Sequence, residues 1–187
     1  MRDACAAVLA GGLSTRFGSD KAMAVFGGET LLARAVRTLR EAGFSQILVV
    51  AKEPGRYAAF AEAVADETPI QTPLAGLRAA LRASRHELVF ACAADMPFVA
   101  DPRLLDALTA AVKDAAVPRN DAVLQTLAAL WRKSRCLPAA DAILERGAPG
   151  PKALIAKVDA VVIDWPDERP FLDADTQEAL EALTRAR

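Results

Sequence analysis

An apolar run that passes directly into a glycine-rich turn constrains this chain more than any other feature. Residues 6–9 are all apolar, the pattern of a buried strand. The chain continues as Ala-Gly-Gly-Leu-Ser-Thr-Arg-Phe-Gly-Ser-Asp-Lys over residues 10–21. The adjacent glycines, Gly11 and Gly12, allow a sharp turn that exposes backbone N–H groups, and Arg16 and Lys21 add two positive charges. A strand, a glycine turn and paired cations predict a cradle for a polyphosphate.

The spacing of this segment separates it from two widespread phosphate-binding loops. The pattern G-x-x-x-x-G-K-[ST] is absent because Ser-Asp-Lys follows Gly18. The dinucleotide pattern G-x-G-x-x-G is absent because Gly11 and Gly12 are adjacent. The residues alone also permit a simpler interpretation, in which a generic glycine turn leads into a helix and both cations are merely solvated.

Composition limits the classes of protein that fit. The 187 residues suit one domain, and a hydrophobic fraction of 53% supplies a core without disulfides. The formal net charge of −1 creates no overall field that would attract nucleic acid or an anionic membrane. We therefore expect neither as a partner, and any attraction for phosphate must be local.

Three scattered cysteines without C-x-x-C spacing predict neither a disulfide framework nor a zinc site. A single histidine argues against a Ser–His–Asp or Cys–His hydrolase. The first strand begins within a few residues of the start, which leaves no room for a signal peptide, and no apolar run approaches ~20 residues. We expect a cytoplasmic protein.

Strand-like runs alternate with helical ones, which predicts an α/β fold with a mostly parallel sheet. No repeat, linker or low-complexity segment interrupts the pattern, so residues 1–187 are expected to form one domain. The predicted strands cover 6–9, 46–51, 87–92 and 160–163, with short apolar segments at 115–117 and 123–131. The predicted helices cover 30–42, 57–64, 73–83, 101–113, 137–146 and 176–185.

Asp95 directly follows the third predicted strand and precedes Pro97 by two residues. Parallel strands place ligands at their carboxyl ends, so Asp95 and the glycine turn are expected at one edge of the sheet. A lone carboxylate there can hold Mg²⁺, with substrate phosphates and water as the other ligands. The alternative is an aspartate that caps a turn before proline.

Two further acidic segments are candidates for a binding site. Asp66 precedes a short loop and the helix start Pro73-Leu-Ala-Gly76, where glycine permits close approach of a ligand; a polar loop that merely leads into the helix is the alternative. Asp173 and Asp175 are two apart, so on an extended chain their side chains point the same way. Asp175 could instead simply cap the terminal helix.

Together these segments resemble the MobA-like nucleotidyltransferases, the family of the molybdenum cofactor guanylyltransferases. The resemblance rests on L-A-G-G-x-S-x-R-x-G-x-D-K from Leu9, the segment from Asp66 to Gly76, Asp-Met-Pro from Asp95, and Asp-x-Asp-Thr from Asp173, in family order. It implies a three-layer, Rossmann-like nucleotide-diphospho-sugar transferase fold with helices on both faces of the sheet. It also implies Mg²⁺-dependent transfer of GMP from GTP to the terminal phosphate of molybdenum-bound molybdopterin, which releases pyrophosphate.

The resemblance implies roles for individual residues. Arg16, Lys21 and Asp95 would be catalytic, and Asp95 and Asp175 would hold the metal, with Asp173 as a substitute for Asp175. Backbone N–H groups of residues 10–13 would cradle phosphate oxygens. The nucleotide would contact Leu9, Ala10, Gly11, Gly12, Lys21, Asp66 and Asp95. Molybdoenzyme chaperones or other proteins of cofactor synthesis could be partners.

Two positions depart from the family pattern. Ala51-Lys52-Glu53 lacks the asparagine that guanine-binding members usually carry after the second strand, and Thr72 replaces a usual glycine. Gly11-Gly12 matches the guanine type of loop, so GTP is the expected substrate. The alternative is a MocA-like cytidylyltransferase, which would use CTP. A nucleotide-binding module without catalysis, a sugar-phosphate nucleotidyltransferase and a Rossmann oxidoreductase are further alternatives; the absent G-x-G-x-x-G opposes the last.

Two rows of arginines, spaced three apart on predicted helices, are expected to form solvated faces. They are Arg34, Arg37 and Arg40, and Arg78, Arg82 and Arg85. Trp131 and Trp165 are expected to be packing residues. The segment 127–132 resembles a family segment near the pterin site, with Thr126 in place of its proline.

Overall fold

One mixed sheet runs through the computed structural model, which describes residues 2–10, 20–147 and 149–185. Its strand order is β10-β7-β9-β6-β1-β4-β5, and β8 pairs with β7. Within this sheet, as far as the structure describes it, β9 pairs antiparallel with β6 and β7, β8 pairs antiparallel with β7, and the other pairs are parallel. The bounds are β1 Arg2–Leu9, β4 Phe44–Ala51, β5 Glu62–Ala65, β6 Leu88–Ala93, β7 Ala115–Asn120, β8 Val123–Leu124, β9 Ala128–Arg132 and β10 Ala160–Asp164.

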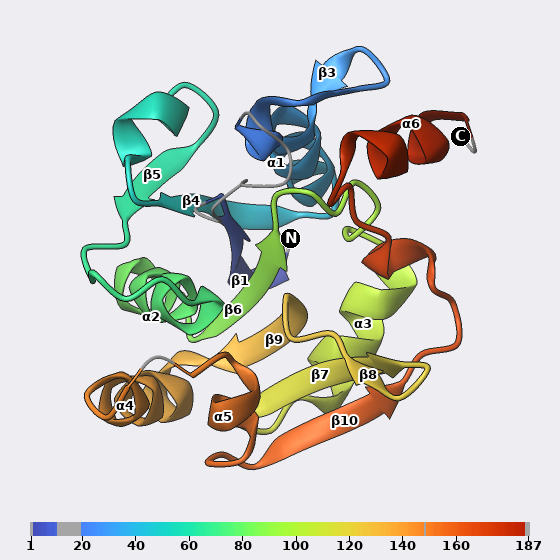
Figure 1. Cartoon of the computed structure of the whole chain (residues 1–187). Coiled ribbons are helices and arrows are strands. Elements are labelled where there is room, and N and C mark those ends of the chain that lie inside the picture. Colours follow the sequence, from blue (N-terminus) through green and yellow to red (C-terminus); the bar gives the residue numbers. More distant parts are fainter. Residues whose placement is uncertain (1, 11–19, 148, 186–187) are drawn as a thin grey trace.

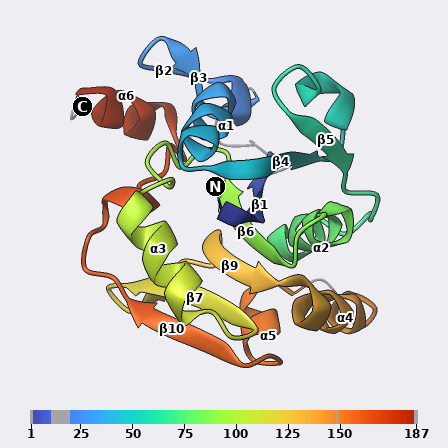
Figure 2. The same ribbon diagram turned by 180° about the vertical axis from the view of Figure 1, so that it is seen from behind.

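Helices cover both faces of the sheet, as Figure 1 shows from one side and Figure 2 from behind. One face is covered by α1 (Leu31–Glu41) and α3 (Pro102–Ala111). The other is covered by α2 (Pro73–Ala83), α4 (Lys133–Leu144) and α5 (Lys152–Ile155). The predicted three-layer α/β fold with a mostly parallel sheet is therefore confirmed.

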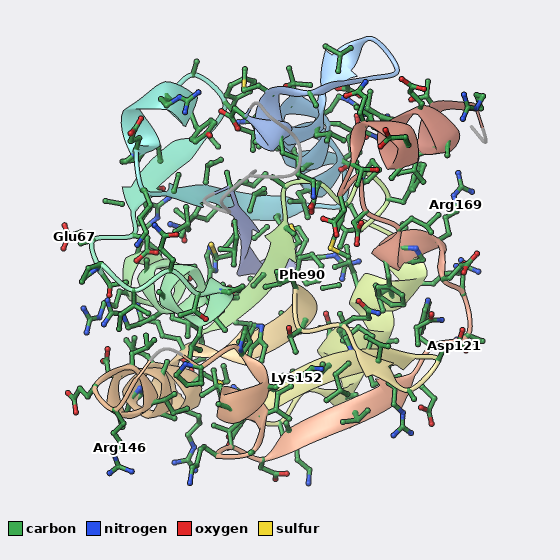
Figure 3. All side chains as sticks on the ribbon, in the orientation of Figure 1. Glu67, Phe90, Asp121, Arg146, Lys152 and Arg169 are labelled. Atoms are coloured by element: carbon green, nitrogen blue, oxygen red, sulfur yellow. The ribbon has the colours of Figure 1, made fainter. Side chains whose placement is uncertain are left out.

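The core is split by the sheet into two apolar clusters, because successive side chains of a strand point to opposite faces. In β1, Ala6 and Val8 join the cluster under α1 and α3, whereas Cys5 and Ala7 join the one under α2 and α4. Phe90 of β6 lies near the centre of the molecule in Figure 3 and is fully buried. Strands buried on both faces explain the uninterrupted apolar runs in the sequence.

Local signals place the helix boundaries. Thr30 accepts a hydrogen bond from the backbone N–H of Ala33 at the start of α1. Asp101 accepts from the N–H groups of Arg103 and Leu104 at the start of α3. Beyond the end of α1, Gly43 has a φ of 94°, a conformation that glycine adopts without steric cost.

A smaller apolar cluster joins the two ends of the chain. It packs the hairpin of β2 (Val25–Phe26) and β3 (Glu29–Thr30) against the terminal helix α6 (Gln177–Arg185), through Phe26, Leu31, Ala174 and Leu180. In Figure 1, α6 lies beside α1 although the two are far apart in sequence. Three short 3₁₀ turns complete the described elements: η1 Lys21–Met23, η2 Pro54–Tyr57 and η3 Arg169–Phe171.

The predicted helix over 57–64 is wrong. Residues 54–57 form only the 3₁₀ turn η2, and residues 62–65 form β5 at the edge of the sheet. β5 pairs in parallel with β4, from Leu48 opposite Glu62 to Ala51 opposite Ala65. The backbone hydrogen bonds offered by β4 thus decide the conformation, and they come from a segment that local periodicity does not include.

Within residues 2–10, 20–147 and 149–185, no helix is both long enough and apolar enough to cross a bilayer.

Candidate active site

Four neighbouring strands end side by side, and each is followed by a candidate residue. Asp95 follows β6, Ala10 follows β1, Lys52 follows β4 and Asp66 follows β5. The strand register places the ends of these strands at the same level, because Leu9 of β1 lies opposite both Ala93 of β6 and Val50 of β4. The sheet therefore brings Asp95 and the start of the glycine segment to one edge, as the sequence predicts.

The central feature of this edge is the side chain of Lys21. Its Nζ contacts Oδ2 of Asp95 and lies 2.5 Å from Oδ1 of Asp175. The side chains of Lys21 and Asp95 are only 16% and 18% exposed, so this charge pair is partly shielded from water. Desolvation opposes the charge on Lys21, but hydrogen bonds to Asp175 and Asp95 outweigh it and raise the pKa of Lys21 above its usual range.

Lys21 is positioned by the residue before it. Asp20 accepts a hydrogen bond from the N–H of Ala22 (3.2 Å) and so caps η1. The other oxygen of Asp20 accepts from the Tyr57 hydroxyl at 2.8 Å and pairs with Arg56 at 3.0 Å. Burial, together with this bond to Asp20, raises the pKa of Tyr57 to about 12. The turn after β4 thus anchors the end of the glycine segment.

Asp175 reaches the edge because the C-terminal segment binds the loop of Asp95. The N–H of Ala174 donates to the backbone oxygen of Asp95 at 3.0 Å, and Ala174 is fully buried. Thr176, not Asp175, accepts the hydrogen bond from the N–H of Ala179 in the first turn of α6. Of the two interpretations of Asp175, the structure therefore favours a carboxylate turned toward the site over a helix cap.

The carboxylates of this corner suit a hard cation. Oδ1 of Asp95 is buried and has no hydrogen-bond partner among the described residues. Desolvation and the charges of Asp175 and Asp95 raise the pKa of Asp173 above its usual range. Within the described ranges, no group of three or more His, Cys, Asp or Glu closes around a metal. Any ion here would need substrate oxygens and water as further ligands, which is how Mg²⁺ is usually held.

Arg34 supports the loop of Asp95, and its expected solvated position is wrong. Its side chain is 12% exposed, and its Nε donates to the backbone oxygen of Pro97 at 3.0 Å. The guanidinium lies 5.0 Å from the ring centre of Phe26 and 5.7 Å from that of Phe98. No signal in the arginine spacing distinguishes Arg34 from its exposed neighbour Arg37, because the contact depends on where the loop after β6 lies.

Arg169 also contacts the Phe98 ring, and its guanidinium lies 4.9 Å from the ring centre. Figure 3 shows Arg169 on the C-terminal segment that follows β10. Arginine over an aromatic face is attracted by the ring quadrupole. The loop of Asp95 is therefore fixed by α1 and by the C-terminal segment together.

Asp66 lies at the other end of the edge and is paired. It is 9% exposed, its Oδ2 lies 2.8 Å from Nζ of Lys52, and its Oδ1 accepts from the N–H of Thr68. Lys52 is a residue that the motifs did not select. Its one signal in the sequence is that it lies in the stretch Ala51-Lys52-Glu53, which lacks the asparagine usual in guanine-binding members of the family.

The remaining predicted residues divide into two groups. Arg16, Gly11 and Gly12 lie outside the described residues. The N–H of Ala10 donates to Val50 at 2.8 Å, so this N–H is not the free phosphate donor that we expected. Leu9 packs beside Gly76 in the first turns of α2. A Cβ atom at position 76 would lie 3.5 Å from the side chain of Leu9.

A twisted, mostly parallel sheet whose carboxyl edge gathers a lysine and several carboxylates is the architecture of nucleotide-handling α/β proteins. A family model described as the MobA-like NTP transferase domain matches residues 6–161. The chain belongs to this family of nucleotidyltransferases. The resemblance inferred from the motifs is thereby confirmed.

Individual relatives agree with the family. A probable molybdenum cofactor guanylyltransferase of Opitutus terrae is 39% identical over 146 residues, which cover 75% of this chain and 72% of the relative. A protein of the same name from Methanosarcina mazei is 33% identical, with 95% and 88% covered. The crystal structure of molybdopterin-guanine dinucleotide biosynthesis protein A from Archaeoglobus fulgidus has the same fold, with a TM-score of 0.82, 22% identity and 97% of each chain covered.

Proposed function

We propose that this chain transfers GMP from GTP to the terminal phosphate of molybdenum-bound molybdopterin, in a Mg²⁺-dependent reaction. The observation that carries the proposal is Lys21 held between Asp95 and Asp175 at the carboxyl edge of the sheet. The names of its relatives support guanylyl transfer to this cofactor. The nucleoside triphosphate substrate follows from the family itself.

The chemistry asks little of a general base. An oxygen of the acceptor phosphate is already anionic, and it attacks the α-phosphorus of GTP. The bond from the α-phosphorus to the bridging oxygen breaks, and pyrophosphate leaves with the electron pair. The barrier comes from repulsion between phosphates and from charge that develops on the leaving group, so positioning and electrostatics supply the catalysis.

The described residues can supply both. Asp95, with its unpaired buried oxygen, and Asp175 would hold Mg²⁺, which would neutralise phosphate charge when bound. Lys21 would contact the triphosphate and stabilise the departing pyrophosphate. Arg16, outside the described residues, is proposed to act with it. The hydrogen bond from Tyr57 to Asp20 would position the neighbouring Lys21. The hydrogen bond from Arg34 to Pro97 would position the loop of Asp95.

The order of the strands supports one direction for the bound nucleotide. Asp95 follows β6 and Asp66 follows β5, with β1 and β4 between them. Three strand spacings of ~4.8 Å separate the two positions by about 14 Å. A nucleotide whose phosphates lie over Lys21 and Asp95 would therefore extend its nucleoside toward Asp66.

CMP transfer from CTP is the second candidate, because the stretch Ala51-Lys52-Glu53 lacks the asparagine that guanine-binding members usually carry after the second strand. Calorimetric titration with GTP, CTP, ATP and UTP, each with Mg²⁺, separates the two. Selective GTP binding that Asp95→Asn weakens, followed by pyrophosphate release with molybdopterin, would support the proposal. Selective CTP binding would move it to cytidylyl transfer, and binding of GTP without turnover would indicate a non-catalytic module.

The remaining expectations are part of the same proposal. One sheet joins β1 to β10, which supports residues 1–187 as a single domain. Molybdopterin is the proposed acceptor, and molybdoenzyme chaperones or other cofactor-synthesis proteins are the proposed recipients of the product. We place the reaction in the cytoplasm.

A further inference from the structure

Lys52 lies at the carboxyl end of β4, one residue beyond the pairing of Ala51 with Ala65. Its neighbours across the edge are the residues that follow β1 and β5. The N–H of Asp66 donates to the backbone oxygen of Ala51 at 2.9 Å, so the chain leaving β5 begins directly beside Lys52. From there residues 66–72 run to Thr72, the N-cap of α2.

The ammonium of Lys52 binds several groups of this loop and so holds the loop against β4. Its Nζ lies 2.8 Å from Oδ2 of Asp66 and donates to the backbone oxygens of Asp66 (3.3 Å), Thr68 and Ile70 (3.3 Å). Four acceptors, spread over five residues, therefore share one cation. Hydrogen bonds to a charged donor are stronger than neutral ones, so this single side chain holds much of the loop.

Other links between the loop and the sheet are the bond from the N–H of Asp66 to Ala51 and the packing of half-buried Ile70 against the apolar cluster under α2. The side chain of Glu67 points away from the molecule in Figure 3, whereas Asp66 beside it is 9% exposed. Apart from the ion pair of Asp66 with Lys52, the side chains of Asp66 and Thr68 accept hydrogen bonds from within the loop, Asp66 from the N–H of Thr68 and Thr68 from the N–H of Ile70. Lys52 is 33% exposed, so its ammonium is only partly shielded from water while it binds the loop.

We propose that Lys52 is a positioning residue that fixes the loop 66–72 against β4 and thereby sets the affinity and base selectivity for the nucleotide. This inference rests on the proposed function, since it assigns the nucleoside end of the ligand to this loop. A fixed loop presents one arrangement of polar groups and rejects bases that do not match it. A loosened loop adapts to several bases, so both affinity and selectivity fall.

The test compares Lys52→Met with Lys113→Met, a matched control whose lysine pairs with the exposed Asp159. Hydrogen exchange followed by mass spectrometry reads the loop without any ligand. We expect faster exchange in residues 66–72 of Lys52→Met, and no change there in the control. Titration with GTP and CTP plus Mg²⁺ should show GTP affinity weakened by ~10-fold or more, a loss typical of a bond to a charged group. The preference for GTP over CTP should shrink in the same variant.

A second variant guards against a folding defect. Lys52→Met combined with Asp66→Asn removes both charges, so no buried carboxylate is left unpaired, and we expect its loop to exchange as fast as in Lys52→Met. Unchanged exchange in both variants, or faster exchange with GTP and CTP affinities within about twofold of the parent, would overturn the inference and leave the proposed function standing. Failure of the parent protein to bind any nucleoside triphosphate would overturn the proposed function itself, and the inference with it.

Discussion

The Nζ atom of Lys21 lies 2.5 Å from Oδ1 of Asp175, a residue 154 positions further along the chain. The same ammonium contacts Asp95, so three distant segments meet at one cation. The contact exists because Ala174 donates a backbone hydrogen bond to Asp95 and places the next residue over the edge of the sheet. One lysine thus offsets part of the negative charge of two carboxylates at this edge of the sheet.

Replacement of Asp95 by asparagine is expected to lower kcat/KM for GTP by ~10²-fold or more, a loss typical of removing a preorganised electrostatic contact. The amide keeps the shape of the side chain but loses the charge that would bind the metal. Steady-state pyrophosphate release measures the effect. Asp106→Asn, at an aspartate that is 73% exposed and pairs with Arg2, is the control. Near-parental turnover by a folded Asp95→Asn protein would exclude Asp95 as a metal ligand.

Replacement of Lys21 by methionine is expected to have opposite effects on catalysis and on metal binding. Activity should fall by ~10²-fold or more because the triphosphate loses a cation. Mg²⁺ binding without nucleotide should become tighter, because the ammonium no longer competes for Asp95 and Asp175. Thermal unfolding at increasing Mg²⁺ concentration reads the second effect: the rise in Tm should be larger for Lys21→Met than for the parent. An equal or smaller rise would show that Lys21 does not occupy the metal position.

Replacement of Arg34 by leucine is expected to destabilise the protein by about 2 kcal/mol, since the hydrogen bonds to Pro97 and Glu29 and two ring contacts are lost. Turnover should also fall, because the Pro97 carbonyl that fixes the Asp95 loop loses its donor. The control is Arg37→Leu on the same helix, whose side chain is 45% exposed, and it should change stability by less than ~1 kcal/mol. Urea unfolding and kcat measure the two effects. Equal stability losses in both variants would contradict the support assigned to Arg34.

Replacement of Tyr57 by phenylalanine is expected to change how stability depends on alkaline pH. Burial and the bond to Asp20 raise the pKa of Tyr57 from 10.0 to about 12 in the folded protein. Between these values the unfolded chain releases the phenolic proton first, so the unfolded state gains stability as pH rises. The free energy of unfolding of the parent should therefore exceed that of Tyr57→Phe below pH 10. This difference should shrink as pH increases from about 10 to 12.

Urea unfolding of the two proteins at pH 9, 10 and 11 tests this expectation. The difference between their free energies of unfolding can shrink by at most about 1.4 kcal/mol per pH unit, because one proton is involved. Stability that is present below pH 10 and lost above it identifies a group whose folded pKa is raised. A gap between the two proteins that stays constant over this range would show that the Tyr57 hydroxyl does not titrate differently on folding.

Much of the fold could be predicted because its signals are local. Apolar runs identified β1, β4, β6 and β10, and capping residues such as Thr30 and Asp101 set the starts of helices. The helix predicted over 57–64 failed because β4 offers an unpaired edge to residues 62–65. The same limit applies to the site: motifs selected Lys21, Asp95 and Asp66, but no pattern pointed to Arg34 or to the contacts of Lys52.

The sequence by itself determined the class of fold, the family and the carboxylates and cations of the candidate site, because each depends on residue type and short spacing. Only the tertiary structure decided which of these groups meet. Lys21 reaches Asp175 across 154 positions and Arg34 reaches Pro97 across 63. Such contacts depend on the order of strands in the sheet and on the path of the C-terminal segment, which follow from the packing of the whole chain.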